Sequence, residues 1–202
     1  MKYKYLLLII VCVVSSCKKD DDSSDFYPSV VTEFALIKTD ASGIMRELIT
    51  DDNRTYTISN PQEGYEKNVS YRAVCGFVPD GQTATLYQIT PAHILRDSTA
   101  LAYEPDATGI VSAWLSGRFI NMQLSPLTQG GTQYWGYRID GVSGNITRIS
   151  LHHRQNGDPL SYTETVYASI ALDNFESVPA GDFITLTVKT FKGDRVWTFQ
   201  KP

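Results

Sequence analysis

The sequence predicts an all-β protein: a small OB-like five-stranded barrel followed by an immunoglobulin-like antiparallel β-sandwich. Short runs rich in Val, Ile, Thr, Tyr and Phe recur along the chain, which suits half-buried strands. Turn residues such as Asp80-Gly81 and Asn156-Gly157 separate these runs. Apolar and polar residues alternate most clearly near the end, where Ile184, Leu186 and Val188 would share one strand face.

Residues 28–98 are predicted to form the barrel. Two hairpins and a longer connection at 59–68 are typical of the OB topology, although the helix usually found in that connection would be missing or reduced. No convincing helix longer than two turns is found, and residues 90–97 are compatible with a short one. The five expected strands are 30–39, 44–50, 54–58, 69–78 and 83–89.

Residues 107–202 are predicted to form the sandwich, after a linker at 99–106 that lies within the stretch DSTALAYEPD. Seven short antiparallel strands in about 100 residues are typical of an immunoglobulin-like fold. A single twelve-stranded β-domain is the alternative architecture. The seven expected strands are 109–115, 118–126, 133–140, 146–153, 162–171, 182–191 and 194–200.

The N-terminus has the pattern of a lipoprotein signal peptide over residues 1–16. Lys2 and Lys4 precede an apolar run at 6–14, which at a rise of ~1.5 Å per residue is too short to span a bilayer. Val14-Ser15-Ser16-Cys17 resembles a bacterial lipobox, so Cys17 is the predicted lipidation site and the membrane the first partner. An ordinary signal peptide is the alternative. Residues 17–27 would form the lipidated cysteine and a polar tether.

Five charged residues follow the predicted anchor directly. They resemble the export tag of surface lipoproteins in Bacteroides-like bacteria, and the alternative is a tether that is simply solvated. Three acyl chains on Cys17 would hold the protein firmly in the lipid. We therefore expect the protein to be lipid-anchored in the outer membrane and exposed at the cell surface. The residues of the predicted tag are Lys18, Lys19, Asp20, Asp21 and Asp22.

Charge and cysteine content argue against a nucleic-acid-binding protein and against a disulfide-stabilised one. The formal net charge is −4 before cleavage, and no region is strongly basic, whereas nucleic-acid binding needs a positive surface. Cys12 is removed with the signal peptide and Cys17 is acylated. Cys75 would then stand alone, so no internal disulfide is expected, and its strand position predicts a buried, inert thiol.

No pattern of catalytic or metal-binding residues is found. His152 and His153 are adjacent in a predicted strand, so their rings would point to opposite faces and would not share a metal; strand-end packing and surface roles explain both. Asn156-Gly157-Asp158 is interpreted as a tight turn that needs no calcium. We therefore expect no catalytic residues, no metal and no cofactor.

Two features point to binding or modification. Trp135 and Tyr137 lie on one face of a predicted strand, and flat aromatic pairs stack on sugars or accept a partner's anchor residues; packing in the sandwich core is the alternative. Asp97-Ser98-Thr99 resembles the O-glycosylation signal of Bacteroides-like bacteria, with Ser98 as the acceptor.

Nearly the whole chain resembles the NigD-like lipoproteins of Bacteroidetes. This resemblance implies an N-terminal OB-like barrel and a C-terminal β-sandwich, and it carries no catalytic residues. The family name comes from a bacteriocin-linked operon. Besides the lipobox and its acidic tag, the resembling segments are LITDDNRTYTI (48–58), YRAVCGFV (71–78), WLSGRFINMQL (114–124), LHHRQNGDPLSY (151–162) and VYASIAL (166–172).

The sequence thus predicts an envelope-anchored lipoprotein that acts as a non-enzymatic binding module for a protein or a glycan. The first alternative is a bacteriocin-immunity-like protein or an assembly partner of another envelope protein. A hydrolase with an unrecognised site is the second alternative.

Overall fold

A computed structural model describes residues 29–202 of the chain. The predicted signal peptide, Cys17 and the tag from Lys18 to Asp22 lie outside the described residues. The described part is almost entirely β-structure, as predicted, and its single 3-10 helix is η1 (Leu172–Phe175). No helix in the described part is both long and apolar enough to cross a membrane.

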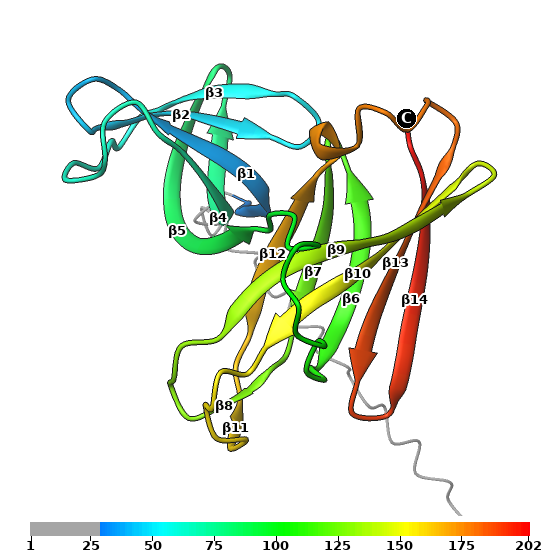
Figure 1. Ribbon diagram of the computed structural model, residues 1–202. Helices are drawn as coiled ribbons and strands as arrows, with labels where there is room; N and C mark the ends of the chain where they lie inside the picture. The colour runs from blue at the N-terminus through cyan, green and yellow to red at the C-terminus, as the bar shows by residue number, and fades with distance from the viewer. Residues whose placement is uncertain (1–28) are drawn as a thin grey trace, which may run out of the picture.

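The first five strands close into a ring (Figure 1). β1 pairs with β2 and β4, β2 with β3, and β4 with β5, and a parallel pairing of β3 with β5 completes the closure. All five predicted strands of this half are present; the specific OB assignment stays a prediction. The strands are β1 (Val31–Thr39), β2 (Met45–Thr50), β3 (Thr55–Ile58), β4 (Ser70–Asp80) and β5 (Thr83–Ile94).

The barrel has its own apolar core because alternate residues of each strand point inward. On β4 these are Ala73, Cys75 and Phe77, which confirms that Cys75 is buried. The 59–69 connection contains no helix. The other buried core residues of the barrel are Ala35, Ile37, Met45, Leu48, Tyr56, Ile58, Ala84 and Leu86.

The second half is a β-sandwich, with β6, β7 and β12 in one layer and the sheet β14-β13-β10-β9 in the other. Its core includes Ile120, Leu151 and Leu186, which come from both layers. All seven predicted strands are found, although the predicted strand 162–171 is split into two. The strands are β6 (Ile110–Ser116), β7 (Phe119–Leu124), β8 (Leu127–Thr128), β9 (Tyr134–Ser143), β10 (Ile146–Arg154), β11 (Tyr162–Thr163), β12 (Val166–Ala171), β13 (Phe183–Thr190) and β14 (Gly193–Gln200).

The expectation that the sandwich is antiparallel throughout is wrong at one pairing, because β10 and β13 run parallel. After β10 the chain crosses to the other layer, forms β12 and η1, and then returns beside β10 in the same direction. A parallel pair needs such a long crossover, whereas a short hairpin produces an antiparallel pair.

The two halves share one sheet. β5 extends to Ile94 and pairs in parallel with β12, through Ala92 opposite Tyr167 and Ile94 opposite Ser169. The short helix considered for residues 90–97 is therefore wrong, because pairing with a distant strand overrides the local preference. The resulting eight-stranded sheet has the order β3-β2-β1-β4-β5-β12-β7-β6.

The segment predicted as a linker lies along the outer face of β9 and β10. Ser98 N donates to Tyr137 O at 2.8 Å, and Asp106 N donates to His153 O at 2.9 Å. Lys189 Nζ donates to Pro105 O at 2.9 Å. Residues 97–106 therefore pack with the second half, and the division into separate folding units stays a prediction.

Candidate functional site

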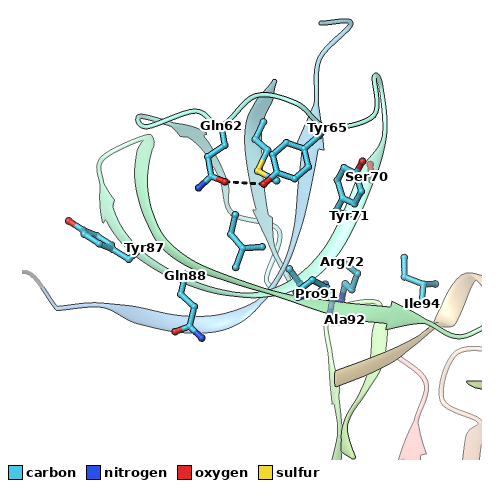
Figure 2. Close-up of a pocket in the computed structure, with 13 residues that line it drawn as sticks. Gln62, Tyr65, Ser70, Tyr71, Arg72, Tyr87, Gln88, Pro91, Ala92 and Ile94 are labelled. Atoms are coloured by element: carbon cyan, nitrogen blue, oxygen red, sulfur yellow. Dashed lines mark hydrogen bonds between the residues drawn. The ribbon is translucent and has the colours of Figure 1, made fainter. Parts of the chain in front are cut away.

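A hollow with a volume of about 570 Å³ opens at one end of the barrel. We call it the barrel pocket. Figure 2 shows Gln62 and Tyr65 on the loop side of the hollow and the curved strand β5 on the other side. Its lining residues are Met45, Gln62, Tyr65, Ser70, Tyr71, Arg72, Ala73, Tyr87, Gln88, Ile89, Pro91, Ala92 and Ile94.

The barrel pocket exists because the connection between β3 and β4 is an irregular loop. A helix in this position would cover the end of the barrel. Instead, the loop places Tyr65 beside Tyr71, with ring centroids 5.9 Å apart in a T-shaped arrangement. Tyr87 is 63% exposed at the mouth of the pocket.

The loop is fixed in position by bonds to the first hairpin. Met45 N donates to Gln62 O at 2.9 Å, and Tyr65 N donates to Gly43 O at 3.2 Å. Gly43 has φ +79°, and a Cβ there would lie 2.3 Å from Tyr65 O. Glycine at position 43 thus permits the close approach that holds Tyr65 over the pocket.

Apart from Arg72, the polar side chains that line the barrel pocket are uncharged. Tyr65 donates its hydroxyl hydrogen to Gln62 Oε1 at 3.0 Å, which orients that amide. Arg72 is the one charged residue in the lining, and its guanidinium is neutralised by the buried carboxylate of Asp51. The pocket therefore suits a neutral ligand with polar groups and flat apolar faces.

The predicted site residues Ser98, Trp135 and Tyr137 lie elsewhere, on the sandwich. Tyr137 is only 2% exposed and packs against Phe175 in the core, so it presents no face to a ligand. Trp135 is half-buried and stacks on His153, with ring centroids 4.1 Å apart. Ligand binding by Trp135 stays a prediction.

Ser98 and Trp135 do help to line a second hollow of about 420 Å³, which we call the sandwich cleft. The Ser98 hydroxyl is half-buried, and its single hydrogen is available to Tyr137 O, 2.9 Å away, or to His152 Nδ1. A glycan on Ser98 would replace this hydrogen; O-glycosylation stays a prediction. The cleft is lined by Arg96, Asp97, Ser98, Leu101, Ala102, Tyr103, Tyr134, Trp135, Gly136 and Arg154.

The two histidines are buried, so the surface role considered for them is wrong. Covering segments explain their burial: residues 97–106 lie over His152, and Trp135 lies over His153. His153 Nε2 contacts Gln133 Oε1 at 2.8 Å, and burial lowers the pKa of His153 below its usual value. Their rings face opposite sides of β10, as predicted from strand geometry.

His152 and Ser98 form a serine–histidine pair, with Oγ and Nδ1 2.7 Å apart. His152 Nε2 lies 2.9 Å from Tyr103 O, and because a carbonyl only accepts, this nitrogen carries the hydrogen. The nearby backbone donors are already used: Ser98 N bonds to Tyr137 O and Tyr137 N bonds to Arg96 O. These two donors are therefore not free to stabilise an oxyanion, as acyl transfer requires.

Asp158 organises the loop between β8 and β9. Its carboxylate accepts hydrogen bonds from Thr128 Oγ1, from Gln133 Nε2 at 2.8 Å, and from the backbone nitrogens of Gln129 and Gly131 at 3.0 Å. The bond from Thr128 and then that from Gln133 are the main reasons why the pKa of Asp158 is lowered to about 2. Asn156 and Gly157 form the predicted turn before it. Within residues 29–202, no group of three or more His, Cys, Asp or Glu is arranged to hold a metal ion.

Comparison with known proteins connects this fold to a family. Residues 91–201 match the model of the NigD-like C-terminal β-sandwich domain. The chain belongs to the NigD-like family. The matched region begins inside β5, at the part of the strand that pairs with β12, and so contains residues of the shared sheet.

Solved structures resemble this NigD-like chain over both halves. A NigD-like immunity protein from Bacteroides caccae is 24% identical, with a TM-score of 0.64, over 86% of this chain and 93% of that one. A protein of unknown function from Bacteroides vulgatus is 12% identical, with a TM-score of 0.67, over 86% and 92% of the two chains. A candidate lipoprotein from Bacteroides fragilis is 11% identical, with a TM-score of 0.58, over 85% and 99%. A search of curated proteins found no match.

The barrel pocket was missed by sequence reasoning. Tyr65 lies in a loop and Tyr71 and Tyr87 in two different strands, so no local spacing links them. A weak signal was present, since a barrel connection without its helix leaves one end open. That signal predicts a hollow, but it does not indicate which side chains line it.

Proposed function

We propose that this NigD-like protein is a lipoprotein at the cell surface that binds a neutral glycan in the barrel pocket and has no enzymatic role. The tyrosine and glutamine side chains in the lining of this pocket, beside one arginine that is already paired with Asp51, are the observation that carries the proposal. Tyrosine rings stack on the apolar faces of sugars, and amide and hydroxyl groups exchange hydrogen bonds with sugar hydroxyls. The volume of about 570 Å³ falls in the range of small-molecule sites.

The proposed location rests on the N-terminal sequence. Cys17 follows an apolar run and would carry the acyl chains, and the tag from Lys18 to Asp22 would direct export to the outer surface. Replacement of Cys17 by Ala is expected to abolish fatty-acid labelling and to release the protein from the membrane fraction. Replacement of Asp20, Asp21 and Asp22 by Ala is expected to preserve labelling but to protect the protein from external protease.

The glycan proposal is tested first on an array of neutral and charged oligosaccharides, and then by calorimetry with the best neutral binder. Tyr65→Ala is expected to weaken binding by about tenfold, the equivalent of ~1.4 kcal/mol. Tyr162→Ala is the matched control, because Tyr162 is an exposed tyrosine outside the pocket. Equal loss in both variants, or no neutral glycan bound, would refute the proposal.

An immunity or assembly partner is the second candidate function. Its support is that a similar structure from Bacteroides caccae is described as a NigD-like immunity protein. Pull-down from solubilised envelopes tests it. Stoichiometric capture of one protein, unaffected by Tyr65→Ala and by competing glycan, would favour this candidate over the glycan-binding module.

A further inference from the structure

We propose that the sandwich cleft is a second binding site, specific for an acidic sugar whose carboxylate is held by Arg154 and Arg96. The site is separate from the barrel pocket, and its lining carries more charge: two arginines and one aspartate lie beside its aromatic rings. The proposal rests on the position of Arg154, on the charged groups of Arg96, Arg154 and Asp97, and on the volume of the cleft.

Arg154 lies against a stacked pair of rings, Tyr103 and His152. His152 is completely buried, and the ring of Tyr103 lies parallel to it, with centroids 4.1 Å apart and an interplanar angle of 22°. The guanidinium carbon of Arg154 lies 5.0 Å from the centroid of the same tyrosine ring. Because Ser98 Oγ and Tyr103 O hold the two nitrogens of His152, the base of the stack is fixed. The guanidinium is thereby positioned before any ligand arrives.

Neither arginine of the cleft has a carboxylate partner among residues 29–202. Arg138, on the adjacent strand, instead forms ion pairs with Asp140 and Glu104. The planar fork of an arginine matches a carboxylate in a bidentate contact, so two unpaired arginines beside one hollow favour a ligand with this group. The rest of the described chain supplies no competing partner to Arg96 or Arg154.

Asp97 narrows the class of ligand. Its Oδ1 accepts from Thr99 N at 2.8 Å and from the Thr99 hydroxyl, while Oδ2 has no hydrogen-bond donor within the described residues. Asp97 is exposed, so its Oδ2 is free to accept a hydrogen bond from a hydroxyl group of the ligand. A ligand with hydroxyl groups beside its own carboxylate would donate hydrogen bonds to Asp97 and place its carboxylate against the arginines. A uronic acid is such a ligand.

The remaining features of the cleft favour a sugar over a peptide. Its volume of about 420 Å³ accommodates one or two sugar rings, and Tyr134, 53% exposed, offers a flat face for stacking. Sites that capture a peptide carboxylate use clustered backbone N–H groups. Here those of Ser98, Thr99 and Leu101 already bond within the protein.

The test is calorimetric titration of the folded protein with digalacturonate and with its neutral counterpart galactobiose. Digalacturonate is expected to bind with an affinity that falls as salt is raised, and galactobiose to bind at least about tenfold more weakly at this site. Arg154→Gln is expected to lower the affinity for digalacturonate by about tenfold. Arg148→Gln is the matched control: Arg148 is an exposed arginine on the same strand, outside the cleft.

Tyr65→Ala in the barrel pocket is expected to leave digalacturonate binding unchanged, so this result is distinct from the test of the proposed function. Three outcomes would overturn the inference. Galactobiose binds as tightly as digalacturonate; Arg154→Gln and Arg148→Gln have equal effects; or a short peptide with a free C-terminal carboxylate binds more tightly than the uronate.

Discussion

Arg72 and Asp51 form a buried ion pair at the junction of the barrel and the sandwich. Arg72 Nη1 lies 2.6 Å from Asp51 Oδ1, and their side chains are 1% and 6% exposed. The same guanidinium donates to Asn121 Oδ1 at 2.9 Å and to Ser169 Oγ at 3.2 Å, on β7 and β12 of the sandwich. Phe119 lies 3.9 Å below it, measured from its ring centroid to the guanidinium carbon. One charge therefore connects three strands, β4, β7 and β12, and the turn after β2, which come from both halves.

The first prediction is that Asp51→Asn destabilises the protein by about 3–5 kcal/mol, because it leaves the buried charge of Arg72 without its partner. Asp52→Asn is the matched control. Asp52 pairs with Arg54 at the surface, where such a pair contributes less than about 1 kcal/mol. Urea denaturation measures both changes. Similar losses in the two variants would contradict the structural importance of the buried pair.

The second prediction concerns where the chain can be divided. A fragment of residues 107–202 lacks the end of β5 and residues 97–106, so β12 would have an open edge and His152 would lose the covering ring of Tyr103. We expect a fragment of residues 91–202 to be more soluble and to melt more cooperatively. Circular dichroism and sedimentation compare the two. Independent, equally cooperative folding of 107–202 would support the division into separate units instead.

The third prediction is that Gly43→Ala displaces the loop that carries Tyr65. The substitution meets both a left-handed backbone, φ +79°, and the carbonyl of Tyr65. Gly81→Ala is the control, since Gly81 has φ +58° but no atom within 4 Å of the added Cβ. Both changes are expected to cost about 1–2 kcal/mol for the backbone conformation. Only Gly43→Ala should also weaken ligand binding in the barrel pocket and shift the amide NMR signals of residues 62–66.

The fourth prediction is that Cys75 does not react in the native state. Burial raises the pKa of its thiol to about 12, and the reactive species is the thiolate. At pH 8, iodoacetamide is expected to leave Cys75 of the native protein unmodified over hours and to label it fully in urea. Mass spectrometry measures the labelling, on a chain that lacks the signal peptide and Cys17 so that Cys75 is its single thiol. Rapid native labelling would mean that the barrel opens readily.

The fifth prediction is a loss of stability in acid that depends on Asp158. Its pKa is about 2 in the folded protein and ~3.9 in an unfolded chain, so the unfolded state binds the proton more readily. The stabilisation by Asp158 is therefore complete above about pH 4 and is lost as the pH falls through about 2. Asp158→Asn should melt at a lower temperature than the natural protein at pH 6, and the difference should shrink toward pH 2. A constant difference would contradict the pKa shift.

Much of the architecture was predictable from the sequence, because strand alternation and turn chemistry are local properties. The period of two in Ile184, Leu186 and Val188 follows from strand geometry alone, and the structure buries all three. The burial of Cys75 follows from the same alternation on β4. Turn residues such as Asn156-Gly157 marked where strands end, and every predicted strand is present.

Only the tertiary structure decided what these strands bring together. Residues 90–94 became strand because β12, far along the chain, offered a partner, and His152 became buried because residues 97–106 fold back over it. Arg72 and Ser169 are 97 positions apart, and Tyr65, Tyr71 and Tyr87 meet through barrel closure. The alternation of residues along a strand is a local property, so the sequence determines which side chains share a face. A pocket or a buried ion pair depends on contacts between distant segments, and no local pattern encodes the order of those segments in the sheet.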